Sequence, residues 1–191
     1  LQSKLVESRI RLEKELLEMP GQIHNQIDLI EYCKQDLAFY TEWRKINPPV
    51  EDSKLKKEEA EKRKTLRELI GTAIREHVLE TKEKTLTSYR GFDIVLPANM
   101  TLEKPYVWLK KSGKYYVELG DTDIGNLIRI DNYLDSLGDH LSKLTLNLEK
   151  LREKEKDIRF ELSKGESYIN QIETYKNKVK NLDKKLGVYK K

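Results

Sequence analysis

The sequence has 191 residues, of which 37% are charged, and its mean hydropathy is −0.75. A chain this polar favours elongated helices over one compact globule, and a formal net charge of +4 neither requires nor excludes a nucleic-acid partner. A single cysteine, Cys33, excludes an internal disulfide, and no apolar run approaches the roughly 20 residues of a membrane span. We therefore expect a cytoplasmic protein. Because the chain begins inside a helical pattern, we also expect a piece of a larger one.

Residues 1–47 predict a helical hairpin. Apolar residues recur at spacings of three and four from Leu1 to Met19, Pro20-Gly21 interrupts them, and the spacing returns until Asn47-Pro48-Pro49. Residues 48–85 predict a charged linker and a third helix, whose apolar stripe returns only at Leu66.

Residues 86–120 predict a three-stranded antiparallel β unit, because helical spacing stops there. Residues 89–96 read as a first strand, with Phe92, Ile94 and Leu96 on one face. Residues 105–110 and 114–119 read as two further strands around a turn in which Gly113 can take the positive φ of a tight hairpin. Three short strands bury too little alone, so one face must lie on a helix.

Residues 121–191 predict a long coiled-coil helix and a returning C-terminal helix. Thr122 or Asp123 is the expected N-cap, and leucine and isoleucine recur at steps of three and four as far as Leu162. A break is expected over residues 163–166. The predicted fold class is mainly α (α+β), with long antiparallel coiled-coil helices and an inserted three-stranded β unit.

No motif meets the requirements of catalysis, of a cofactor or of a metal. Asn47-Pro48-Pro49-Val50 lacks the aromatic residue that stacks on the flipped base in amino-adenine DNA methyltransferases. Gly113-Lys114-Tyr115 lacks the hydroxyl residue of a phosphate-binding loop, and the three histidines have no partner at a zinc-ligand spacing. We expect no enzyme activity, no cofactor and no metal in this segment.

Two groups of residues are candidates for contact with nucleic acid. Tyr106, Trp108 and Tyr116 lie among lysines in the predicted hairpin, a combination that can stack bases and bind phosphates. The C-terminal lysines can also bind phosphates. Packing of the aromatic residues and solvation of the lysines remain the alternatives. The candidates are Lys110, Lys111, Lys114, Tyr116, Lys180, Lys184 and Lys185.

Two short motifs resemble a known family. Residues 89–92 read YRGF, and residues 120–132 read GDTDIGNLIRIDN. With a hairpin between them and a leucine-rich coiled coil after them, these motifs resemble the C-terminal region of the large Swi/Snf-type helicase and DNA methyltransferase fusion proteins of bacterial conjugative elements and phages. The resemblance covers roughly residues 20–186.

The resemblance implies a non-catalytic accessory domain that helps its parent protein to engage DNA, with the upstream domains of that parent as partners. The alternative is a protein-interaction or dimerisation module, such as a homodimer through the coiled coil. The family pattern is matched by Gly91, Phe92, Gly125, Asn126, Arg129, Asp131 and Asn132. We favour a structural role for these residues, since they can shape the entry into a helix and tie that helix to the β unit.

Overall fold

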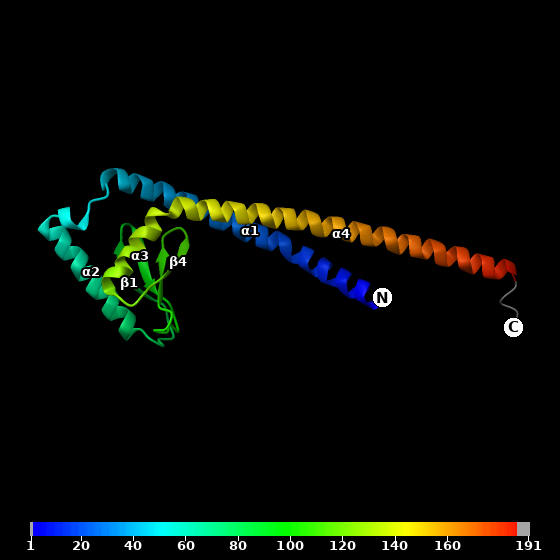
Figure 1. Cartoon of the computed structure of the whole chain (residues 1–191), viewed down its shortest axis with the longest axis horizontal. Coiled ribbons are helices and arrows are strands. Elements are labelled where there is room, and N and C mark those ends of the chain that lie inside the picture. The colour runs from blue at the N-terminus through cyan, green and yellow to red at the C-terminus, as the bar shows by residue number, and fades with distance from the viewer. Residues whose placement is uncertain (1, 187–191) are drawn as a thin grey trace. The chain divides into compact units, whose positions relative to one another are not determined.

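A computed structural model describes residues 2–186, with the exception of the side chains of residues 2, 3, 52, 166, 167, 183, 185 and 186 (Figure 1). The chain is mainly helical and contains one small antiparallel sheet, which confirms the coarse fold class. Two compact units can be distinguished: a helical unit from the described parts of residues 1–27 and 146–191, and an α/β unit, residues 28–145. These units divide the chain differently from the four consecutive ranges expected from the sequence.

Residues 2–186 form two long and two shorter α-helices, with one 3-10 turn between the first two. In chain order they are α1 (Gln2–Ile46), the turn Asp52–Lys54, α2 (Lys57–Glu76), α3 (Asp123–Asp135) and α4 (Leu137–Leu186). Both α1 and α4 contribute to the helical unit, where they run in opposite directions (Figure 1). The ammonium of Lys154 on α4 pairs there with the carboxylate of Glu15 on α1.

The expected hairpin break at Pro20-Gly21 is wrong, because α1 continues through both residues. A proline inside a helix costs about 3 kcal/mol, since it removes one hydrogen bond and crowds the preceding turn. Packing on either side offsets that cost: Met19 is fully buried and Ile23 is half-buried. Burial of the apolar stripe therefore decides the course of this helix.

The expected N-cap at Thr122 is confirmed, but the expected break in the C-terminal helices is in the wrong place. No break occurs at residues 163–166, where Ser163 donates its hydroxyl hydrogen bond to Phe160 O within the helix (2.7 Å) instead of capping a new one. Gly165 costs only about 1 kcal/mol in a helix. The chain breaks earlier, at Ser136, whose hydroxyl donates to Tyr133 O (3.0 Å) and competes with the helical hydrogen bonds.

The sheet has four antiparallel strands in the order β1-β2-β3-β4, so the predicted count of three is wrong. The strands are β1 (Lys84–Tyr89), β2 (Phe92–Leu96), β3 (Tyr106–Lys110) and β4 (Lys114–Glu118). The last three match the predicted strands. The missed strand, β1, is polar, and a bulge between Thr85 and Thr87 interrupts the alternation by which strands are predicted.

One face of the sheet packs against helices, as expected for so small a sheet. Its inward side chains are fully or almost fully buried, and they share a core with residues of α1, α2, α3 and the start of α4. The inward residues are Phe92, Ile94, Leu96, Val107, Leu109, Tyr115 and Val117. Cys33 lies in the same core, and its pKa is raised by burial.

A buried carboxylate fixes the turn between β3 and β4 to α1. Asp36, which is fully buried, accepts hydrogen bonds from the backbone N–H groups of Ser112 (3.0 Å) and Gly113 (2.8 Å) and from the Tyr115 hydroxyl (2.6 Å). Burial and the bond to Asp36 raise the pKa of Tyr115.

The turn does not use the positive φ predicted for Gly113. A side chain at position 113 would still require Tyr115 to move, because a Cβ there would lie 2.6 Å from the Tyr115 hydroxyl oxygen.

We expect Asp36→Ala to lower the free energy of unfolding by about 3 kcal/mol or more, because it leaves buried donors of the β3–β4 turn without an acceptor. The matched control is Glu42→Ala, which removes an exposed ion pair with Lys45 on the same helix and should cost about 0.5 kcal/mol or less. Urea unfolding followed by circular dichroism measures both. Equal midpoints would show that the Asp36 hydrogen bonds do not hold the turn.

Candidate functional site

The outward face of the sheet carries three aromatic rings in mutual contact. The ring centroids of Tyr106 and Tyr116 lie 4.7 Å apart, and Trp108 lies 5.5 Å from Tyr106 and 5.8 Å from Tyr116. Tyr116 has 45% of its surface exposed, and the other two rings are half-buried. Beneath them Val95, a cross-strand neighbour of Trp108, is only 2% exposed. The rings thus form a continuous apolar surface open to solvent.

The structure separates the three candidate lysines of the hairpin. Lys110 and Lys114 lie at the aromatic surface, and each makes an ion pair of 2.7 Å with the carboxylate of Glu83. The Lys114 ammonium also lies 4.3 Å from the centroid of the Trp108 ring, within range of a cation–π interaction. Lys111 instead lies 3.7 Å from the ring centroid of Phe39 on α1. Only two of the three lysines therefore belong to the aromatic surface.

Glu83 was not a candidate from the sequence, although it controls the charge of this surface. Its hydrogen bonds with Lys110 and then Lys114 lower its pKa from 4.5 to about 2. A lowered carboxyl pKa means that the ion pairs stabilise the fold above pH 4.5 and lose that effect as the pH falls toward 2. At neutral pH Glu83 is ionised and occupies both ammonium groups.

The C-terminal candidate lysines belong to the helical unit. Lys180 and Lys184 are exposed on α4. The side chain of Lys185 lies outside the described part of the chain. No ion pair is described for Lys180 or Lys184, so within the described residues these two are freer to meet phosphates than Lys110 and Lys114.

Three residues of the family pattern, Gly125, Asn126 and Arg129, form hydrogen bonds at the beginning of α3. Thr122 caps the helix by accepting a hydrogen bond from the N–H of Gly125 (3.1 Å). Asn126 is buried and accepts one from the N–H of Gly120 (2.7 Å), and the Arg129 guanidinium donates to Glu118 O (3.5 Å). These bonds join the end of β4 to α3.

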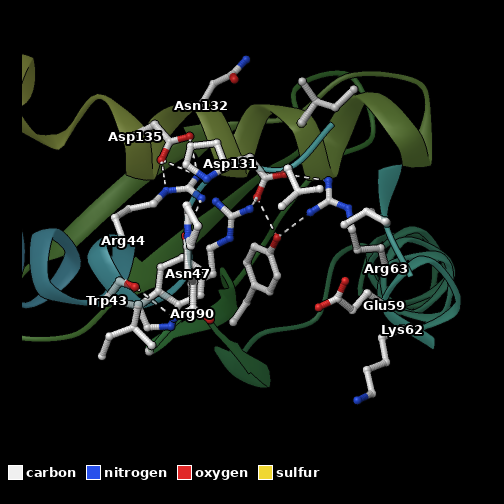
Figure 2. A pocket seen from close by; sticks show the side chains of 18 residues that line it. Trp43, Arg44, Asn47, Glu59, Lys62, Arg63, Arg90, Asp131, Asn132 and Asp135 are labelled. Atoms are coloured by element: carbon white, nitrogen blue, oxygen red, sulfur yellow. Dashed lines mark hydrogen bonds and ion pairs between the residues drawn. The ribbon is translucent and has the colours of Figure 1, made fainter. Parts of the chain in front are cut away.

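An arginine–aspartate network joins the YRGF turn to the middle of α3 (Figure 2). The carboxylate of Asp131 accepts from Arg63 (2.8 Å), Arg90 (3.0 Å) and the Tyr89 hydroxyl (2.7 Å). Burial, followed by the charge of Asp131, raises the pKa of Tyr89 to about 12. Exposed fractions of 12% to 17% place the three charged side chains largely out of water. One carboxylate thus holds two guanidinium groups.

The network continues from Arg90 to α1. The Arg90 guanidinium donates to the Tyr40 hydroxyl (3.0 Å), which in turn donates to Asp135 (2.6 Å). Arg44 contacts both carboxylate oxygens of Asp135 at 2.7 Å. Burial, followed by the hydrogen bond to Asp135, raises the pKa of Tyr40 to about 12. The β1–β2 turn, α1, α2 and α3 are therefore connected by charged hydrogen bonds.

The turn itself requires its glycine. Arg90 and Gly91 have φ values of 50° and 82°, the two left-handed positions of a tight two-residue hairpin between β1 and β2. A Cβ on Gly91 would also lie 2.4 Å from the Phe39 ring. Phe92 then enters the core, fully buried. The sequence prediction had placed this turn inside a strand.

An open cleft of about 890 Å³ lies beside the network and is lined by Arg44, Arg63, Arg90, Asp131 and Asp135, together with the Asn47-Pro48-Pro49-Val50 segment (Figure 2). Asn132 lies at its edge and is exposed. The arginines that line the cleft are paired with Asp131 and Asp135, so these charges hold the surrounding elements together. We do not assign a ligand to it.

Comparisons with protein-family models, with curated protein sequences and with solved structures found no match for this chain. Among the described residues, no helix is long and apolar enough to cross a membrane, and no group of three or more His, Cys, Asp and Glu side chains could hold a metal ion.

We expect Asp131→Asn to lower the free energy of unfolding by about 3 kcal/mol, because the two largely buried arginines lose the charge that they share. Asn132→Ala, the adjacent exposed position of the family pattern, should cost about 0.5 kcal/mol or less. Thermal unfolding of both variants measures the difference. Similar melting temperatures would show that the ion pairs of Asp131 with Arg63 and Arg90 do not stabilise the fold.

Proposed function

We propose that this segment is a non-catalytic accessory domain that contacts single-stranded DNA through the aromatic face of its sheet. The single observation that carries the proposal is the solvent-open surface of Tyr106, Trp108 and Tyr116, with Lys110 and Lys114 beside it. A sheet face of this composition combines stacking platforms for bases with cations for phosphates.

Single strands fit this surface better than duplex DNA. Unpaired bases can leave their own stack and lie on aromatic side chains, each contributing about 1–3 kcal/mol without requiring a particular sequence. The bases of a duplex are already stacked inside it and reach a flat protein face only by their edges. A protein that separates DNA strands exposes the substrate that this face would accept, which agrees with the helicase-like parent implied by the family resemblance.

The electrostatic part of the proposed contact is small. Both lysines already interact with Glu83, so a phosphate must compete with that carboxylate. The net gain from the lysines is correspondingly reduced, and stacking should supply most of the affinity. We therefore propose weak binding that supports, and does not replace, the DNA contacts of a larger protein.

We further infer that the helical unit is an antiparallel coiled coil that carries the α/β unit. Support comes from the opposite directions of α1 and α4, from the ion pair between Glu15 and Lys154, and from the apolar side chains of both helices that recur at steps of three and four. A coiled coil of this kind suits a spacer or an assembly element.

The competing function is a protein-interaction module without DNA contact. It is favoured by a separate observation, the long helices of the helical unit, which suit assembly with other chains. The two functions use different units of the chain and can therefore be tested independently.

Tyr116→Ala should weaken binding of a fluorescent oligothymidine of about 15 nucleotides by about ten-fold, because one stacking platform is lost. Because Tyr116 is exposed, we expect the melting temperature of this variant to stay close to that of the unsubstituted chain. The matched control is Tyr32→Ala, which removes another exposed tyrosine of the α/β unit. Fluorescence anisotropy at one fixed salt concentration compares the variants. Equal affinities, or no binding by the parent chain, would refute the proposal.

Glu83→Gln should strengthen the same binding several-fold and make it more dependent on salt, because Lys110 and Lys114 become available to phosphates. Glu103→Gln is the control, since it removes the same charge from an exposed loop position. The measurement is a salt titration of the anisotropy signal. If both substitutions change the affinity equally, the effect is one of net charge and Glu83 has no specific part in it.

A further inference from the structure

Strand β4 is an edge of the sheet and is regular along its whole length. The strand order places it last, and it pairs with β3 residue by residue from Lys114 to Glu118 without a shift in register. The other edge, β1, has an irregular register between Thr85 and Thr87. A regular edge strand can accept a further strand, because it offers a row of backbone donors and acceptors. Of the two edges, β4 is therefore the one that suits strand addition.

The backbone groups of every second residue of β4 face away from the sheet. The N–H of Leu119, directly after the strand, donates to Pro105 O beside β3 (2.9 Å). Successive residues of a strand direct their N–H and C=O groups to opposite sides, so the alternation that begins at Leu119 fixes the direction of the others. The residues whose backbone groups face outward are Lys114, Tyr116 and Glu118.

The side chains of these outward residues have a charge order that is complementary to itself. Lys114, Tyr116 and Glu118 are exposed and alternate with two buried residues. When two copies of β4 lie antiparallel with Tyr116 opposite Tyr116, Lys114 of each copy lies opposite Glu118 of the other. Opposite charges in directly opposite positions stabilise a strand pair, and like charges destabilise it. A second copy of the chain thus supplies the complement at both ends of the strand.

The same register satisfies the backbone. All of its pairs join residues whose backbone groups face outward, and each such pair exchanges two hydrogen bonds. A shift by one residue would bring these groups opposite groups that are already bonded to β3. A shift by two residues would keep the hydrogen bonds but place Tyr116 opposite a charged residue and remove both charge pairs. Only the register centred on Tyr116 therefore meets both requirements.

Two existing contacts at this edge are compatible with an added strand. The Arg129 guanidinium donates to Glu118 O at 3.5 Å, the limit of a hydrogen bond, and a carbonyl oxygen has two lone pairs. The Lys114 ammonium is paired with Glu83, but it has three N–H donors and its side chain is 42% exposed. Glu118 O and Lys114 can each accept a second partner.

We propose that this chain forms a two-fold symmetric dimer in which the β4 strands of two copies pair antiparallel, centred on Tyr116. The pairing joins the two four-stranded sheets into one continuous sheet. Because the two-fold axis is normal to that sheet, the aromatic faces of both copies lie on the same side, with the Cα atoms of the two Tyr116 residues about 5.5 Å apart. The dimer does not rest on DNA binding by that face and is tested without DNA.

Charge reversal at either end of β4 tests the pairing. Glu118→Lys places lysine opposite lysine, and Lys114→Glu places glutamate opposite glutamate, so each variant alone should raise the dimer dissociation constant about ten-fold or more. Glu103→Lys, the same charge change in the exposed loop before β3, should raise it about two-fold or less. Sedimentation of the whole chain over a concentration series measures all four proteins. A monomeric unsubstituted chain, or a dimer that neither reversal weakens, overturns the proposal.

A mixture of the two reversal variants separates a lost interface from a lost fold. In a mixed dimer each lysine of the Glu118→Lys chain lies opposite a glutamate of the Lys114→Glu chain. An equimolar mixture should therefore dimerise about as tightly as the unsubstituted chain, although neither variant does so alone. Chains that had failed to fold could not recover in this way. A mixture that dimerises no better than its components overturns the proposal.

A proline at the centre of the strand tests the backbone hydrogen bonds. Tyr116→Pro and Tyr116→Ala both remove the ring, but only proline removes the outward N–H, which β3 does not use. Tyr116→Pro should weaken the dimer at least about ten-fold more than Tyr116→Ala, because two hydrogen bonds related by the two-fold axis are lost. Sedimentation compares the two variants. Equal dissociation constants would show that the strands do not pair through their backbones, and the proposal would fail.

Discussion

The α/β unit depends on one buried carboxylate. Asp36 lies on a long helix, and its three hydrogen bonds end on the turn and the first residues of the β3–β4 hairpin. A buried charge without donors would be very unfavourable, so the hairpin must bring its N–H groups to α1 for the unit to fold. The orientation of the whole sheet follows from this contact, because β3 and β4 carry the inward residues of the core on one side and the aromatic surface on the other.

The polar residues of the unit serve two different purposes. Asp131, Asp135 and the arginines around them lie largely out of water and connect the β1–β2 turn to three helices. Buried ion pairs contribute little net stability, but a single removed partner is costly, so they specify the arrangement of elements more than they strengthen it. Lys110, Lys114 and Glu83 form the exposed counterpart. Their ion pairs can exchange with an anionic ligand without disturbing the core.

Local patterns in the sequence predicted most of the elements, and long-range packing explains the rest. Strands β2, β3 and β4 follow from alternation of apolar residues, and the long helices follow from spacings of three and four. Pro20 misled the prediction because packing of Met19 and Ile23 offsets its local cost, and Gly165 did so because a glycine inside a helix costs only about 1 kcal/mol. Asp36 was missed although it is three residues from Cys33 and four from Tyr40, on the apolar side of its helix. A charged residue in such a position is the signal that could have revealed the contact.

The bulge in β1 has a consequence for self-association. β1 is an edge strand, and a regular edge offers unpaired N–H and C=O groups to a strand of another molecule. The irregular register between Thr85 and Thr87, with Lys84 beside it, distorts that edge and places a charge on it. Strand addition, the common route to domain swapping and amyloid, is thereby disfavoured at this edge.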